Sequence, residues 1–136
     1  MTIARTYALI IGWLLTAVGI VGFFFPAGLL LGVLEVNVLH NIVHVVTGLV
    51  ALFFGYYMTG HYSRTFDQWL GIVYAIITVV GVATAGLGAA SILGILPVNL
   101  ADNVLHLAVA VTALAAGFLT TKEEVMAEEP TMRRAA

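Results

Sequence analysis

The amino-acid sequence predicts an all-α fold, a four-helix transmembrane bundle made of two tandem helical hairpins. The evidence is an extreme apolar composition, four apolar stretches of membrane-spanning length, and an internal repeat in which each copy contains two of these stretches. Of the 136 residues, 62% are hydrophobic and 9% are charged, and the mean hydropathy is +1.09. Soluble proteins have about 25% charged residues, and a single small domain cannot bury this much apolar surface. Lipid is therefore expected to cover it.

Four stretches are close to the ~20 residues that a helix needs to cross a bilayer. We expect these spans at about residues 7–25, 38–59, 69–88 and 102–120. The first is too long for the apolar region of a signal peptide and is expected to be retained. Residues 121–136 are predicted to be a polar cytoplasmic tail, with a composition that is usually disordered.

The second half of the chain repeats the first at a constant offset of 62 positions. The matched pairs include Leu31 and Leu93, Asn37 and Asn99, Asn41 and Asn103, His44 and His106, and Gly55 and Gly117. A fixed period without gaps indicates duplication. Repeat 1 covers about 7–59 and repeat 2 about 69–120, within one membrane domain over 1–120. Two spans per repeat predict hairpins related by a pseudo-twofold axis along the membrane normal.

The connection within each hairpin, residues 26–37 or 89–101, is itself apolar. Backbone close to lipid must satisfy its own hydrogen bonds, so we expect short helices at the outer membrane surface. The basic residues are Arg5, Arg64, Lys122, Arg133 and Arg134, and none lies in these two connections. The positive-inside rule then predicts that both termini and a 60–68 loop are cytoplasmic.

Polar residues gather where the second span of each repeat begins. They are Asn37, His40, Asn41 and His44 in repeat 1, and Asn99, Asp102, Asn103 and His106 in repeat 2. Helical spacing places positions i, i+4 and i+7 on one face, and polar groups at this depth usually face the bundle interior. We expect a structural cluster in which His44 bonds to Asn103 or Asp102 and His106 bonds to Asn41.

Two other interpretations of the cluster stay open. His40, His44, Asp102 and His106 could complete the tetrahedral shell of a structural, zinc-like metal ion. Alternatively, His44 and His106 could ligate one haem from both sides, or each could hold a chlorin at the lipid-facing surface. The simplest expectation is no cofactor. Ion transport is not indicated, because the predicted spans carry no charged residue at mid-depth.

The Asn-xxx-Asn-xx-His pattern at residues 37–44 and the Asp-Asn-xx-His pattern at 102–106 resemble bacterial four-span membrane proteins of domain-of-unknown-function family 4383. The resemblance covers about residues 5–120. It implies four spans and a bacterial inner-membrane location, and it implies no reaction.

Function is predicted from what the chain lacks. Hydrolase, metalloprotease and phosphate-loop motifs are absent, as is cysteine, so no enzyme activity is expected. The net charge of −2 argues against nucleic acid. We expect a non-enzymatic accessory or structural subunit of a larger bacterial membrane complex, whose partners are lipid and other membrane subunits and which has no soluble substrate. The alternative is a membrane protein that binds haem, chlorin or a metal through the paired histidines.

Overall fold

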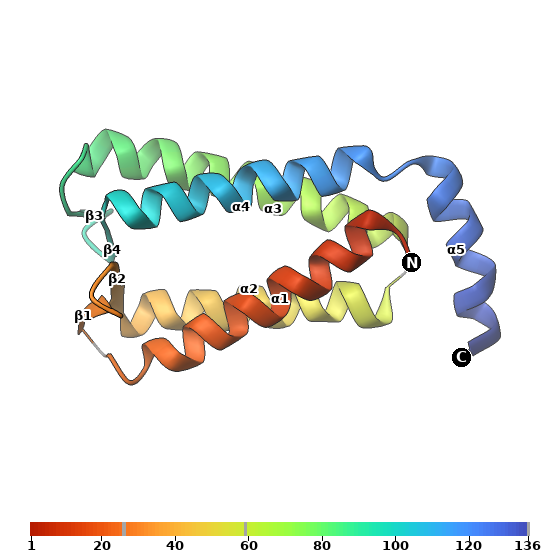
Figure 1. Cartoon of the computed structure of the whole chain (residues 1–136), viewed down its shortest axis with the longest axis horizontal. Coiled ribbons are helices and arrows are strands. Elements are labelled where there is room, and N and C mark those ends of the chain that lie inside the picture. Colours follow the sequence, from red (N-terminus) through yellow and green to blue (C-terminus); the bar gives the residue numbers. More distant parts are fainter. Residues whose placement is uncertain (26, 59, 136) are drawn as a thin grey trace.

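The computed structural model describes residues 1–25, 27–58 and 60–135. The elements follow in the order α1 (Ile3–Gly22), β1 (Ala27–Leu30), β2 (Leu34–Asn37), α2 (Val38–Tyr57), α3 (Gly60–Ala85), β3 (Ala90–Ile92), β4 (Leu96–Val98), α4 (Leu100–Leu119) and α5 (Lys122–Ala135). Figure 1 shows two long helical hairpins side by side, α1–α2 and α3–α4. The strands lie at one end of the bundle, the strand end, and the N-terminus and α5 lie at the other, the α5 end.

Helices α1 to α4 are long and apolar enough to cross a membrane, which confirms the predicted four-helix membrane fold. Helices α1, α2 and α4 have 20 residues each. At a rise of 1.5 Å per residue they are about 30 Å long, the thickness of a bilayer core. The predicted boundaries are right to within a few residues for these three helices.

The third helix is longer than predicted, because residues 60–68 are helical and do not form a loop. Residues 61–68 contain no glycine or proline that would break a helix, and the polar side chains of Ser63 and Arg64 find partners on neighbouring helices. The Ser63 hydroxyl donates to the Phe54 carbonyl oxygen at 3.0 Å, and Arg64 donates to the Gly117 carbonyl oxygen at 3.1 Å. The bundle therefore extends beyond the apolar stretch at the α5 end.

The connections inside the hairpins are β-hairpins, so the prediction of short surface helices is wrong. Strand β1 pairs antiparallel with β2, and β3 pairs antiparallel with β4. Each turn has two residues with positive φ, Leu31 (53°) with Gly32 (75°), and Leu93 (53°) with Gly94 (71°). This left-handed geometry suits a tight hairpin and ends any helix. Cross-strand hydrogen bonds satisfy the backbone as a helix would have done.

The two helices within each hairpin pack closely through glycines. A Cβ atom added to Gly12 would lie 2.8 Å from Leu52, and one added to Gly55 would lie 2.6 Å from Leu9. At both glycines the backbone of one helix therefore packs directly against a side chain of the other. Gly71 and Gly117 have the same role between α3 and α4. This close approach of helices at small residues is the usual means of association where lipid removes the hydrophobic effect.

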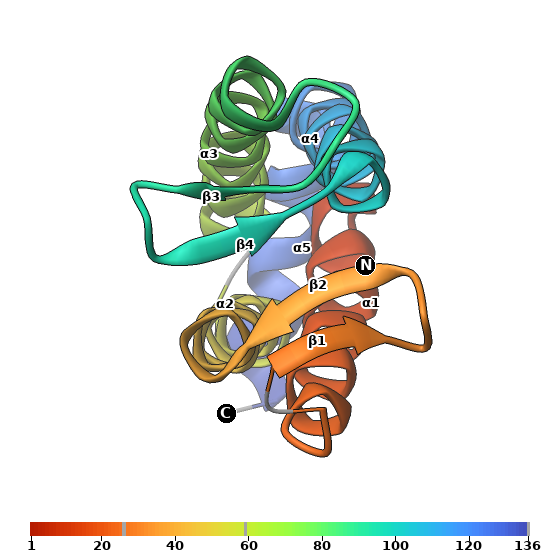
Figure 2. The same ribbon diagram turned by 90° about the vertical axis from the view of Figure 1, so that its left-hand side faces the viewer.

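The two hairpins meet along a central core. Figure 2 looks down the bundle from the strand end, with α3 and α4 on one side and α1 and α2 on the other. The buried residues of this core are Ile11, Leu15, Ala51, Leu70, Tyr74, Ala110 and Ala113. Ala51 and Ala113 are equivalent positions of the two repeats. The duplicated small residues therefore also bring the two hairpins together.

The tail predicted as disordered forms helix α5, and contacts within the chain hold its first half. The Glu128 carboxylate accepts from Arg5 Nη1 at 3.1 Å and from the backbone N–H of Thr2 at 3.4 Å. The Arg5 Nε atom also donates to the Gly55 carbonyl oxygen at 2.7 Å. The Thr120 hydroxyl accepts from the Ala4 N–H at 2.9 Å. The start of α1 is thus joined to α2, to α5 and to the residue that caps α4.

The glycine packing gives a stability prediction. We expect Gly81→Ala to destabilise the protein by about 1–3 kcal/mol, because the added methyl group meets the buried Asn103 amide and the core cannot expand freely. Gly88→Ala is the matched control, since an added methyl group there comes no closer than 3.5 Å to its neighbours. Unfolding in detergent measures both. Equal midpoints for the two variants would contradict the α3–α4 packing.

Candidate functional site

The asparagines that begin each polar cluster are helix caps. Asn37 precedes α2, and its Oδ1 accepts from the His40 N–H at 2.8 Å. Asn99 precedes α4, and its Oδ1 accepts from the Asp102 N–H at 3.0 Å. Asparagine is among the strongest N-cap residues because it satisfies a backbone N–H that has no partner within the helix. The two caps therefore lie just before the helices and do not share the face of His44 or His106.

Each cap asparagine also reaches across to the opposite repeat. Asn37 Nδ2 donates to the Ile95 carbonyl oxygen at 2.7 Å, and Asn99 Nδ2 donates to the Val33 carbonyl oxygen at 2.7 Å. Donors and acceptors are equivalent pairs in the repeat, so the two bonds are reciprocal. Strands β2 and β4 lie side by side at this end of the bundle (Figure 2). The pseudo-twofold axis predicts reciprocity of this kind, and the axis itself stays a prediction.

Asp102 links the two repeats a second time. Its Oδ2 atom accepts from the Asn99 N–H at 2.9 Å, which completes a capping box, and from the Glu35 N–H at 3.0 Å. Glu35 lies in β2 of the first repeat. Asp102 is 4% exposed, and the two backbone donors direct its carboxylate toward the strands. The acid is thus used to hold β2 against the start of α4.

Asn41 and Asn103 face into their own hairpins, and the expected bonds to the histidines are absent. Both are buried, at 0% and 2% exposed. The side chain of Asn41 lies against Gly22 of α1, and that of Asn103 lies against Gly81 of α3. Their amide atoms have no hydrogen-bond partner among the described residues. The cross-pairing of His44 with Asn103 and of His106 with Asn41 was wrong, because the spacing cannot show which neighbouring helix a buried face meets.

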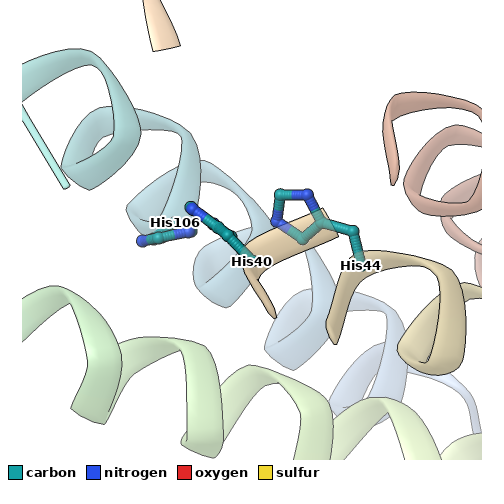
Figure 3. Close-up of side chains that lie close together, drawn as sticks. All are labelled: His40, His44 and His106. Atoms are coloured by element: carbon teal, nitrogen blue, oxygen red, sulfur yellow. The ribbon is translucent and has the colours of Figure 1, made fainter. Parts of the chain in front are cut away.

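The histidines come together in the bundle interior (Figure 3). His40 and His44 project from α2, and His106 projects from α4 on the opposite hairpin. One possible ligand atom from each ring lies within 4.8 Å of those of the other two. The ring centroids of His40 and His44 are 4.5 Å apart, and those of His40 and His106 are 6.1 Å apart. His40 lies between the other two rings.

This arrangement separates the cofactor interpretations. A haem held between His44 and His106 needs the space that His40 occupies (Figure 3). A chlorin on the lipid-facing surface needs an exposed ligand, whereas the three rings are only 4%, 9% and 7% exposed. Imidazole nitrogens that converge in the interior suit a metal ion instead. Four residues were predicted as possible metal ligands. The structure brings the three histidines together, whereas the Asp102 carboxylate accepts hydrogen bonds from backbone N–H groups.

Two interior residues were missed by sequence analysis. Tyr74 is buried beside the cluster, with its ring centroid 5.5 Å from that of His106. Asp67 is fully buried in α3, and neither carboxylate oxygen has a hydrogen-bond partner in the described part of the chain. The prediction of a loop at residues 60–68 gives Asp67 no helical face, whereas this segment is helical. Helical spacing of Ser63, Asp67 and Tyr74 on one face of an extended third helix was the available signal.

The comparisons agree with the fold. Four helices long and apolar enough to cross a bilayer define a multi-pass membrane protein. The chain belongs to the family described as Domain of unknown function (DUF4383), which matches residues 5–119. The resemblance drawn from the Asn-xx-His patterns is thereby confirmed. The chain matches no curated protein and no solved structure.

The bridging role of Asp102 can be measured. We expect Asp102→Ala to destabilise the protein by about 1–3 kcal/mol, because two partly buried backbone N–H groups lose a charged acceptor. Asp102→Asn should lose less, since one amide oxygen remains as an acceptor. Hydrogen exchange at the Glu35 amide should accelerate in the alanine variant, whereas Glu123→Ala, at an exposed position of α5, should leave it unchanged. Unchanged Glu35 protection in Asp102→Ala would refute the bridge.

Proposed function

We propose that this protein is a non-enzymatic subunit of a larger membrane complex in the bacterial plasma membrane, with both termini in the cytoplasm. Its partners would be lipid and other membrane proteins. The bacterial location rests on what the sequence resemblance implies. The orientation rests on the positive-inside rule, since Arg5, Arg64 and Lys122 all belong to segments at the α5 end.

The observation that carries the subunit proposal is the shortness of the connections. Within the described ranges, the strand end consists of two tight β-hairpins, and α2 ends at Tyr57 while α3 begins at Gly60. A soluble substrate would therefore meet almost no protein surface. The surfaces available for binding are helix α5 and the apolar outer faces of α1 to α4. These outer faces carry exposed side chains such as Trp13, Trp69 and Val111. Such a surface suits contacts with lipid and neighbouring membrane helices.

The proposed orientation has a direct test, because the chain contains no cysteine. Ser91→Cys introduces a thiol in β3 at the strand end, and Glu123→Cys introduces one in α5. Both positions are exposed. In intact cells a membrane-impermeant maleimide should label the first and should reach the second only after lysis. Labelling of the α5 position in intact cells would refute cytoplasmic termini.

The partner can be located by photocrosslinking at membrane depth. A photoreactive residue replaces Trp13, Phe53, Trp69 or Val111, so that one exposed position probes each of the four helices. We expect one helix face to give a single crosslinked protein that also co-purifies in a fixed ratio in mild detergent. Tyr74 is the control position, because its aromatic side chain points into the core. Lipid adducts alone at all four positions, with a detergent particle containing one chain, would refute a subunit role.

A further inference from the structure

We propose that His40, His44 and His106 bind one divalent transition-metal ion of the zinc type inside the bundle, near the strand end. This inference goes beyond the subunit role and does not depend on it. A metal site could exist whether or not the protein has partners, and a partner could bind the outer faces whether or not the interior holds a metal.

The geometry of the three rings is close to that of a metal shell. Their candidate ligand atoms lie within 4.8 Å of one another. Zinc binds imidazole nitrogen at about 2.0–2.1 Å, which places neighbouring nitrogens of one tetrahedral shell about 3.3 Å apart. Small side-chain rotations would cover this difference. Helix α2 supplies two of the ligands at i and i+4, a spacing that puts both on one face of a helix.

The hydrogen-bond state of the rings gives an independent reason. The Nδ1 atoms of His40, His44 and His106 are all buried and have no hydrogen-bond partner among the described residues. Buried polar atoms nearly always have a partner, and an unsatisfied one costs free energy. The side chains of Asn41, Asn103 and Asp67 also contain buried atoms without a partner, but the three histidine atoms belong to rings whose possible ligand atoms converge. One cation coordinated by the cluster would satisfy several of them together.

The surroundings of His40 resemble the outer shell of a metal site. The backbones of Glu35 and Pro97 and the Asp102 carboxylate are the groups close enough to His40 to interact with it electrostatically. Metal-binding histidines usually donate their second ring N–H to a carbonyl or carboxylate, which fixes the orientation of the ring. Asp102 is therefore placed as an outer partner that would help to balance the charge of the ion.

The donor set selects the class of metal. Three imidazoles suit zinc, copper, nickel and cobalt, whereas calcium and magnesium require oxygen ligands. Within the described residues the cluster offers no fourth protein ligand. The fourth position of a tetrahedral shell would fall to a water molecule or another small ligand.

Divergence of the two repeats explains why there is one site and not two. His44 and His106 are equivalent, but the residue equivalent to His40 is Asp102. The first repeat therefore supplies two imidazoles and the second supplies one imidazole and one carboxylate. Because the ligands come from α2 and α4, a bound ion would join the two hairpins at their centre. Metal binding to the folded state should then raise stability.

The test uses the full-length protein without a polyhistidine tag, stripped of metal by a chelator in detergent. It is titrated with Zn²⁺ against a competing indicator, and with Co²⁺ followed by visible absorption. We expect one ion per chain, a tetrahedral cobalt spectrum, and a zinc-dependent rise in the unfolding midpoint. The variants His40→Ala, His44→Ala and His106→Ala should each bind zinc at least about tenfold more weakly.

The chain provides its own control in His61, the fourth histidine, which is exposed in α3 at the α5 end. His61→Ala should bind zinc as the unmodified protein does. If an alanine variant fails to fold, the corresponding glutamine variant replaces it. The proposal is overturned if the unmodified protein shows no one-to-one binding or an octahedral cobalt spectrum. It is also overturned if His61→Ala weakens binding as much as the other variants, or if none of the three weakens it.

Discussion

The strand end of this protein depends on two side-chain amides that each make two hydrogen bonds. The oxygens of Asn37 and Asn99 cap α2 and α4, and their nitrogens donate to the turns of the opposite repeat. A cap alone fixes where a helix begins, and a cross-bond alone fixes how two hairpins lie. Because one amide does both, the start of each helix is set by the position of the other hairpin. Because the start of each helix is fixed, the positions of the polar residues farther along α2 and α4 in the bundle are fixed as well.

The interior histidines follow from that constraint. With the two helix starts held at matching positions, His106 and the His40–His44 pair meet at one depth in the bundle. Duplication gave both repeats the same polar pattern, but the two copies no longer have the same role. Asp102 holds β2 against the start of α4, whereas the equivalent His40 turns into the cluster. Two repeats of similar sequence thus carry an asymmetric group of side chains.

The α5 end is organised differently, by charge and not by repeated amides. Arg5 joins the Glu128 carboxylate of α5 to the Gly55 carbonyl oxygen of α2, so three segments distant in sequence are held by one guanidinium. The ion pair is largely shielded, with side-chain exposures of 17% and 6%. Buried pairs of this kind contribute mainly by fixing one arrangement, since desolvation offsets much of their attraction. The polar tail consequently has a defined place against the bundle.

The sequence by itself determined the fold class, the four helices and the identity of the polar residues. The length of the apolar stretches and the 62-residue repeat can both be read directly from the sequence. In lipid, a spanning backbone must form its hydrogen bonds within its own helix, so stretches of this length are predicted to be helices.

Tertiary structure decided the remainder. Helical spacing shows that Asn41 and His44 share a face, but only packing shows that Asn41 meets Gly22 and His44 meets the opposite hairpin. The apolar connections predict short helices, whereas the left-handed Leu31–Gly32 turn belongs to a β-hairpin. Contacts between segments far apart in the chain leave no periodicity in the sequence, because each depends on a surface that exists only after the hairpins have packed.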